Sequence, residues 1–288
     1  MESDKNHAVP SFIVGGAGRT GTSWLHKCLR EHPNIFVPNR KELNFFSENW
    51  DKGEDWYEKC FKGRKSEKEI GEVSPSYLST ENVAHRIYEY NPRVKLIFIF
   101  RDPVERAYSE YCQRLRQEMV SKEILKEINE ESEIVKGSIY YENLKKFLSY
   151  FEDGQIEIKL YEDLDNDPRS FLSSIYSFLE VDEQFVPKIV EDKFHRRKPP
   201  PKVKKIHSFL KKISSHIKSS GHTGKRIFEY VNGSILSDYY NKLNQDEDVP
   251  SLPTEKKQKL VEFFSEDVDK LSKCIGTNLR KKWLKKYE

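Results

Sequence analysis

The sequence predicts an α/β fold, a single domain with a central parallel sheet flanked by helices. Two observations carry this prediction. A short apolar run at residues 11–15 leads through a glycine-rich loop into a segment with helical spacing, and a longer apolar run at residues 94–100 leads into another. Strands that alternate with helices pair in parallel, because each helix returns the chain to the end of the sheet where the next strand begins. The length of 288 residues suffices for one such core.

The first elements follow from this alternation. Apolar and β-branched residues at 11–15 predict a buried strand that ends in glycines. Apolar residues then recur at helical spacing as far as Leu29, and Pro33 ends this helix. Residues 34–38 predict a brief extended piece, and residues 41–46 predict a loop or a short helix.

The middle of the chain repeats the pattern. Residues 83–90 predict a helix, and residues 94–100 form the most strand-like window, which we interpret as a central strand. Pro103 suits the first turn of the helix that follows. Residues 118–151 predict a long helical region with an interruption at 137–138.

The remaining elements continue to the end of the chain. Residues 156–160 predict a strand, and an Asp-Pro step opens a helix at 167–179. An amphipathic helix is expected at 206–217. Thr254 is expected to cap a final helix.

The predicted domain organisation is simple. Residues 1–10 are interpreted as an N-terminal tail and residues 11–288 as one domain. Within it, residues 193–253 supply a basic loop, a helix and a connection, and residues 254–288 a C-terminal helical segment. The net charge of +3 conceals a local excess, since residues 193–226 contain twelve Lys or Arg and no Asp or Glu. Such a run is either a solvated face or an anion-binding one.

The composition excludes a disordered chain and a membrane-spanning one. Aromatic residues make up 12% of the chain, the mean hydropathy is -0.80, and no run approaches the roughly 20 apolar residues of a membrane helix. Residues 1–10 show no hydrophobic run typical of a signal peptide. The four cysteines form no C-x-x-C pair. We therefore expect a soluble, cytoplasmic protein with no membrane span, and nothing in the sequence indicates its oligomeric state.

The glycine-rich loop is the first candidate binding element. A glycine turn before a helix N-terminus presents unpaired N–H groups at the positive end of the helix dipole, so it favours phosphate-like anions. Residues 16–23 read G-x-x-x-x-G-T-S, whereas the nucleoside-triphosphate loop requires Lys where this chain has Thr22. Arg19 lies inside the loop and supplies a cation at a different place. A purely structural turn is the alternative.

The second candidate element follows the strand at 94–100. Arg101 and Ser109 place a cation and a hydroxyl beyond the carboxyl end of this strand, where parallel sheets bind ligands. Together with the glycine loop they offer two separate anion pockets, which suits a nucleotide with two phosphate positions. The alternative is a helix cap at Asp102 beside a surface arginine.

With these two motifs, the sequence resembles the sulfotransferases that use 3′-phosphoadenosine 5′-phosphosulfate (PAPS). The first motif is similar to the family's 5′-phosphosulfate loop and the second to its 3′-phosphate motif. The likeness covers roughly residues 10 to 185, and its signatures are most similar to those of glycan O- and N-sulfotransferase domains and their bacterial relatives. The matching segments are 13–25, 41–46, 56–57, 71–77, 98–109 and 161–164.

The resemblance implies roles for individual residues around the donor nucleotide. It implies that the 5′-phosphosulfate is held by Arg19, Thr20, Gly21, Thr22 and Ser23, and that Trp24 borders the adenine. It also implies that Arg101 and Ser109 bind the 3′-phosphate. The basic loop that would close over the nucleotide contains Arg196, Arg197 and Lys198.

Two positions depart from the pattern of the heparan-type relatives. Their loop lysine, which contacts the oxygen that bridges phosphate and sulfate, is Arg19 here, and Val73 stands where they commonly carry a lysine. Arginine keeps its proton, so it is a weaker general acid, but it can still neutralise the charge of the leaving group.

An alcohol acceptor needs a base, and Glu42 matches the glutamate that the glycan-type relatives use. The alternative is a surface carboxylate that pairs with Arg40 or Lys41. The candidate acceptor residues are Lys41, Gln113 and Arg114. The resemblance therefore implies sulfuryl transfer from PAPS to a hydroxyl or amine of a sugar, glycan or small molecule, with release of PAP.

Two other function classes remain as alternatives. The first is a P-loop kinase for a nucleotide or small molecule, with Asp102 holding magnesium. The second is nucleic-acid binding by residues 193–226, which lack the interleaved aromatic residues of stacking surfaces, so no nucleic-acid partner is expected. No H-E-x-x-H or Cys-His cluster is present in the sequence, and we predict no metal.

Overall fold

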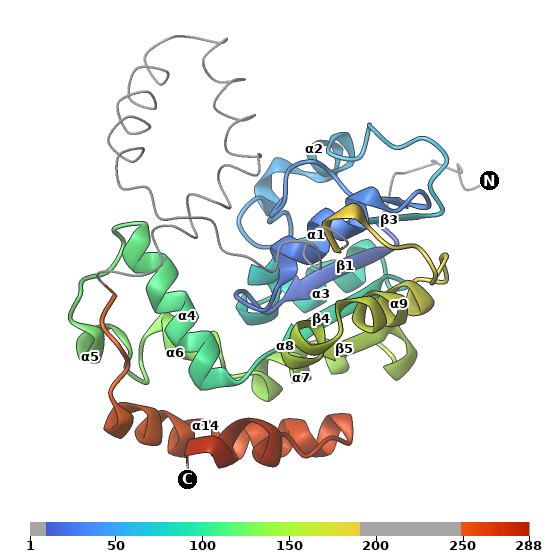
Figure 1. Ribbon diagram of the computed structural model, residues 1–288. Coiled ribbons are helices and arrows are strands. Elements are labelled where there is room, and N and C mark those ends of the chain that lie inside the picture. The colour runs from blue at the N-terminus through green and yellow to red at the C-terminus, as the bar shows by residue number, and fades with distance from the viewer. Residues whose placement is uncertain (1–9, 191–248, 288) are drawn as a thin grey trace, which may run out of the picture. The chain divides into compact units, whose positions relative to one another are not determined.

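The computed structural model describes residues 10–190 and 249–287 of the chain. Residues 10–190 and 252–287 belong to one compact unit, which contains every strand and every described helix (Figure 1). The predicted amphipathic helix at 206–217 lies outside the described residues, as does most of the predicted region 193–253.

A parallel sheet of five strands forms the centre of this unit, in the order β2-β3-β1-β4-β5. The predicted α/β class with a central parallel sheet is confirmed. Phe12 pairs with Gly71 on one side and with Lys95 on the other, so the first strand in the chain is the middle strand of the sheet. The strands are β1 (Phe12–Gly16), β2 (Ile35–Phe36), β3 (Glu69–Val73), β4 (Lys95–Phe100) and β5 (Ile156–Leu160).

Helices connect and cover the strands. They are α1 (Thr22–Glu31), α2 (Glu54–Lys59), α3 (Val83–Tyr90), α4 (Pro103–Arg116), α5 (Ile124–Glu127), α6 (Glu133–Lys136), α7 (Tyr141–Leu148), α8 (Tyr161–Asn166), α9 (Pro168–Phe178) and α14 (Thr254–Ile275). Short turns of other helix types are η1 (Trp50–Lys52), η2 (Pro75–Ser79), η3 (Asp153–Gln155), η4 (Arg280–Leu284) and η5 (Lys285–Tyr287).

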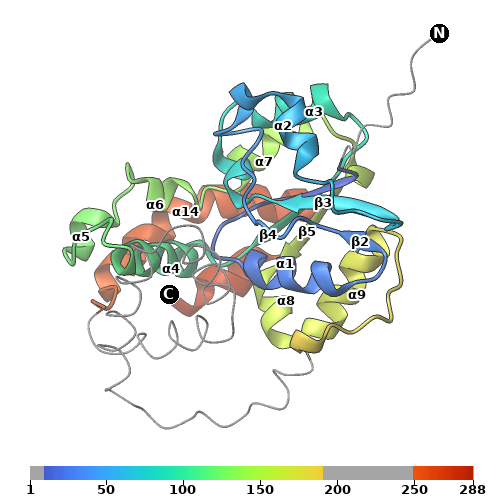
Figure 2. The same ribbon diagram turned by 90° about the horizontal axis from the view of Figure 1, so that it is seen from above.

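Both faces of the sheet are covered, with α1, α8 and α9 on one side and α2, α3 and α7 on the other (Figure 2). Alternate residues of β4 serve the two sides: Ile97 and Ile99 join the cluster under α1 and α9, while the ring of Phe98 packs on Phe147 of α7 at 4.9 Å. A strand buried on both faces has no polar alternation. This explains why residues 96–100 form one continuous apolar run.

The C-terminal segment packs against the same unit. The carboxylate of Asp267 on α14 accepts hydrogen bonds from the N–H groups of Tyr140, Tyr141 and Glu142, at 2.7, 3.1 and 3.2 Å, and so caps α7. Burial raises the pKa of Asp267, and these N–H donors oppose that shift. Tyr287 donates a hydrogen bond to Asp102 at 2.9 Å, which brings the end of the described chain to the start of α4.

Several predicted elements differ from the structure. The predicted long helical region 118–151 is wrong, because the chain makes a turn after α4, with Glu118 at φ 60°, and then forms the three short helices α5, α6 and α7. Thr254 does not cap α14: it is the first helical residue, Pro253 is at the cap position, and no side chain caps this end.

Strand β3 was not predicted as a strand. Only two of its five residues, Ile70 and Val73, have large apolar side chains, so the segment lacks the continuous apolar run that is typical of a buried strand. Residues 41–46 form a loop rather than a helix, and Glu42 and Asn44 adopt left-handed backbone conformations, with φ 62° and 51°.

Candidate active site

Three loops lie together at the carboxyl end of the sheet because β3, β1 and β4 are neighbouring parallel strands. The glycine loop follows β1, the segment beginning at Ser74 follows β3, and Arg101 follows β4. A methyl group on Gly16 would lie 2.9 Å from the carbonyl oxygen of Pro75, so the glycine loop packs directly on the turn after β3. This end of the sheet therefore gathers the two predicted anion-binding elements and the predicted base loop.

Gly21 shapes the loop before α1. Its φ of 88° is left-handed, and a Cβ there would meet Leu164 Cδ2 at 2.6 Å. The side chain of Thr20 is fully buried and donates to the carbonyl oxygen of Ala17 at 2.7 Å, so this hydroxyl closes the loop on itself. Thr22 and Ser23 begin α1, where the first N–H groups have no partner inside the helix. This is the geometry in which a helix N-terminus can accept an anion, and anion binding by the loop stays a prediction.

The change Gly21→Ala is expected to weaken donor binding at least tenfold and to lower the melting temperature. Alanine at this φ is strained by about 1–2 kcal/mol, and its methyl group has no room beside Leu164. Calorimetry with PAP and thermal denaturation check both effects. Gly154→Ala is the matched control, because nothing lies within 4 Å of a Cβ there and its φ is not positive. An unchanged PAP affinity in Gly21→Ala would contradict the proposed shape requirement.

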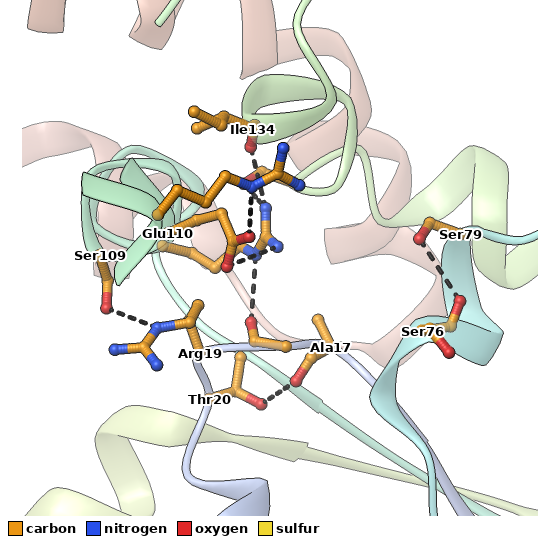
Figure 3. A network of polar contacts seen from close by, with 12 residues as sticks. Ala17, Arg19, Thr20, Ser76, Ser79, Ser109, Glu110 and Ile134 are labelled. Atoms are coloured by element: carbon orange, nitrogen blue, oxygen red, sulfur yellow. Dashed lines mark hydrogen bonds and ion pairs between the residues drawn. The ribbon is translucent and has the colours of Figure 1, made fainter. Parts of the chain in front are cut away.

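Arg19 joins the two predicted anion-binding elements. Its Nε donates to the Ser109 hydroxyl oxygen at 3.2 Å, from the glycine loop to α4 (Figure 3). The backbone of Arg19 is left-handed, with φ 70°. Burial lowers the pKa of its guanidinium, and Glu110 opposes this shift. The structure therefore brings together the two residues that the sequence assigned to different phosphate positions.

Arg101 is a half-buried cation at the end of β4. Its guanidinium lies 4.7 Å from the centre of the Tyr161 ring and 3.7 Å from a carboxylate oxygen of Glu105. Asp102 caps α4 by accepting hydrogen bonds from two backbone N–H groups, and it also pairs with Lys286 at 2.8 Å. The helix cap that the sequence left as an alternative is therefore present, and it leaves the guanidinium beside it available to an anion.

Arg106 is a buried arginine that supports the glycine loop by a hydrogen bond to its backbone. It is only 7% exposed, and it donates to the carbonyl oxygens of Gly18 and Ile134, at 3.1 and 2.9 Å, and to the Ser138 hydroxyl at 3.2 Å. Burial lowers the pKa of this guanidinium. Gly137 is required beside it, because a Cβ there would meet Arg106 Nη1 at 2.7 Å. The sequence reasoning missed Arg106, although its spacing to Glu110 and Arg114 on α4 was a usable signal.

Glu42 stands on the loop beside β3 with 52% of its side chain exposed. Its N–H donates to the carbonyl oxygen of Val73 at 2.9 Å, and its carboxylate pairs with Lys41 at 2.5 Å. The ion pair with Lys41 that the sequence offered as an alternative is therefore present. Because it is exposed, the carboxylate is accessible to an incoming acceptor. Its role as a base stays a prediction.

The other predicted site residues are placed less clearly. Trp24 packs against Phe171 at the edge of the hydrophobic cluster, with ring centres 6.5 Å apart, and its contact with adenine stays a prediction. Gln113 and Arg114 lie on α4, but Arg114 donates to Glu110 at 2.8 Å and so is already paired within the helix. Their role toward the acceptor is untested. Arg196, Arg197 and Lys198 lie outside the described residues.

The kinase alternative, which requires a magnesium ligand at Asp102, is not favoured. Within residues 10–190 and 249–287, no group of three or more His, Cys, Asp or Glu side chains is arranged to hold a metal ion. Asp102, the magnesium ligand in the kinase alternative, instead caps α4 and contacts Lys286 and Tyr287.

Taken together, the fold and the arrangement of its loops define an α/β protein with a P-loop-type fold. The sulfotransferase domain model matches residues 10–225, and the chain belongs to the sulfotransferase family. The alternatives of a kinase and of a nucleic-acid binding protein are not favoured.

Named relatives and solved structures agree with this family. The chain is 33% identical to heparan sulfate glucosamine 3-O-sulfotransferase 5 of Homo sapiens over 187 residues, which cover 60% of this chain and 54% of that protein. It is 38% identical to the membrane-associated sulfotransferase kil1 of Dictyostelium discoideum over 106 residues, covering 36% and 22% of the two chains. The chain thus matches about half the length of the first of these relatives and less of the second.

The fold is shared with a sulfotransferase from Alicyclobacillus acidocaldarius, with a TM-score of 0.67 at 23% identity, over 93% of this chain and 96% of that one. The family relatives also correct one expectation. They are heparan sulfate sulfotransferases and an enzyme named as membrane-associated, so the predicted cytoplasmic location is wrong. Among the described residues, every helix is too short or too polar to cross a bilayer.

Proposed function

We propose that this protein transfers the sulfuryl group of PAPS to a hydroxyl or amine of a sugar or glycan. The observation that carries the proposal is the contact between Arg19 and Ser109, which joins a 5′-phosphosulfate loop to a 3′-phosphate motif. The names of the heparan sulfate relatives support a glycan acceptor. Family membership supports PAPS as the donor and PAP as the product.

The roles of the residues follow from what the reaction needs. The acceptor oxygen attacks sulfur in line as the bond from sulfur to the phosphate oxygen breaks, and little covalent chemistry is left to the protein. Glu42 takes the proton of the acceptor hydroxyl. Arg19 offsets the negative charge that develops on the leaving phosphate, and Arg101 with Ser109 binds the 3′-phosphate.

The residues fit such a donor. Two cations stand on separate loops at the carboxyl end of the same sheet, and Gly21 lets the loop before α1 pack closely against Leu164. Lys41, Gln113 and Arg114 are proposed to face the acceptor. The basic residues Arg196, Arg197 and Lys198 are proposed to close over the nucleotide. No metal is proposed to take part.

Calorimetric titration with PAP, beside ATP plus magnesium in the same buffer, tests this proposal. We expect PAP to bind with a dissociation constant at least about tenfold lower than that of ATP, because a 3′-phosphate adds a charge-assisted contact of roughly 1.5–3 kcal/mol. Transfer of labelled sulfate from PAPS to a heparan-type oligosaccharide then tests the acceptor class. A preference for ATP with magnesium would overturn the donor assignment.

A further inference from the structure

Glu72 is a buried carboxylate that the proposed reaction does not use. It lies near the end of β3 and is only 1% exposed. Three hydroxyl groups donate to it: those of Tyr57 and Tyr77 reach Oε1 at 2.5 and 2.9 Å, and that of Ser74 reaches Oε2 at 2.6 Å. Within the described part of the chain none of its hydrogen-bond partners is a cation. Burial raises the pKa of Glu72, and the three hydroxyl donors oppose that shift.

Two of these hydroxyls also contact the loop that carries Glu42. The N–H of Asn44 donates to the Ser74 hydroxyl oxygen at 3.2 Å, and the N–H of Phe46 donates to the Tyr77 hydroxyl oxygen at 3.3 Å. Because all three hydroxyls donate to Glu72, their protons point toward its carboxyl group. The oxygen lone pairs of both hydroxyls then remain free to accept from the two loop N–H groups.

The third hydroxyl belongs to a side chain that packs on the same loop. The ring of Tyr57 stacks on Phe45 with centres 4.3 Å apart and an angle of 10° between the planes. Thus three consecutive loop residues, 44–46, contact groups that are oriented by one carboxylate.

The loop needs such support because its backbone is strained. Glu42 and Asn44 both have left-handed φ angles, which residues other than glycine adopt only when surrounding contacts impose them. The direct bond from Glu42 to β3 is a single backbone hydrogen bond to Val73. The hydroxyls of Ser74 and Tyr77 fix the backbone N–H groups of residues 44 and 46, while Ser76 donates to the Asn44 side chain at 3.1 Å and Arg86 to the Phe46 carbonyl oxygen at 2.9 Å.

We propose that Glu72 is a positioning residue for the candidate base, and that it holds the Glu42 loop through the hydroxyls of Ser74, Tyr77 and Tyr57. This inference rests on the proposed function, since it assigns Glu72 to the acceptor side of the same site. Glu72 contacts neither the glycine loop nor Arg101, so its effect falls on proton removal rather than on donor binding.

The change Glu72→Gln tests the proposal in the full-length chain. Glutamine keeps the volume, but its amide nitrogen cannot accept a hydrogen bond, so one hydroxyl contact must be broken or reversed. We expect kcat to fall by about 10–100-fold, as for a displacement of a catalytic group by about 1 Å. The dissociation constant of PAP is expected to stay unchanged. A general loss of folding would instead lower kcat and weaken the binding of PAP as well.

A double-variant cycle separates positioning from other effects. If Glu72 acts through Glu42, Glu72→Gln costs nothing further in a Glu42→Gln background. Tyr77→Phe removes one hydroxyl and keeps the ring, and it should show the same split between kcat and PAP affinity in case Glu72→Gln fails to fold. The control is Tyr90→Phe, since the buried Tyr90 hydroxyl has no hydrogen-bond partner in the described residues.

The outcomes are distinct. An equal loss of rate from Glu72→Gln in both backgrounds overturns the positioning role, as do wild-type kcat values in Glu72→Gln and Tyr77→Phe. A wild-type protein that neither binds PAP nor transfers sulfate contradicts the proposed function itself, and this is seen before any variant is made. Full activity in Glu42→Gln contradicts the base assignment and the positioning proposal with it.

Discussion

Replacement of Glu42 by glutamine is expected to lower the rate of sulfuryl transfer by about 10²–10⁴-fold, the usual contribution of a general base. An amide cannot take the proton of an acceptor hydroxyl. The affinity for PAP is expected to change by less than about twofold, well under the tenfold that 1.4 kcal/mol would give. The reason is that Glu42 stands beside β3 and the glycine loop follows β1.

Steady-state rates with saturating PAPS, beside calorimetry with PAP, measure the two effects separately. Glu48→Gln is the matched control, an exposed glutamate on the same loop. A wild-type rate in Glu42→Gln would show that Glu42 is not the base and that its ion pair with Lys41 is its remaining assigned role. A large loss of PAP affinity would instead move Glu42 into the donor site.

Replacement of Arg106 by methionine is expected to lower the free energy of unfolding by about 2–4 kcal/mol, because buried polar partners lose their donor. The carbonyl oxygens of Gly18 and Ile134 would be left unpaired, as would the hydroxyl of Ser138. For a chain of this size the melting temperature should fall by about 3–7 °C. Since Gly18 lies in the glycine loop, PAP affinity should fall with it.

Thermal denaturation and PAP calorimetry on the folded variant check this prediction. Arg106→Lys keeps the charge, but a single ammonium group cannot reach both Gly18 and the pair Ile134 and Ser138 as the guanidinium does. An intermediate loss of stability is therefore expected. Arg93→Met, at an exposed arginine, serves as the control. Methionine at position 106 with wild-type stability and PAP affinity would show that the glycine loop is held by its own backbone alone.

Local signals predicted the regular elements well. The helix at Val83–Tyr90 and the strand at Ile156–Leu160 have the predicted bounds, and the α4 and α9 helices begin at the prolines that the sequence singled out. In each case the periodicity or the cap lies within a few residues of the element, so neighbouring residues suffice to define it.

The missed features depend on residues that are distant in the sequence. Strand β3 contains Glu72, and its burial is tolerated only because tyrosines from α2 and η2 donate to it. The helical region 118–151 is divided by the turn at Glu118 and by the side-chain cap at Ser132.

Motif spacing singled out Arg19, Arg101 and Ser109 as candidate ligand-binding residues, and the structure brings Arg19 and Ser109 into contact. Their role toward a ligand stays a prediction, and the residues that support them were not predicted. Arg106 and Glu72 were missed because they contact other parts of the protein, and such contacts depend on packing across the sheet.

The position of β1 in the middle of the sheet links ligand binding to the folding of the whole unit. Both β3 and β4 pair with it from far along the chain, so long loops must close before any part of the site exists. The loops that would bind the donor and the acceptor therefore depend on the same sheet. If PAP binds these loops as proposed, mass action makes the opening of the sheet rarer as the concentration of free PAP rises, and the nucleotide-free protein is then the form more exposed to proteases.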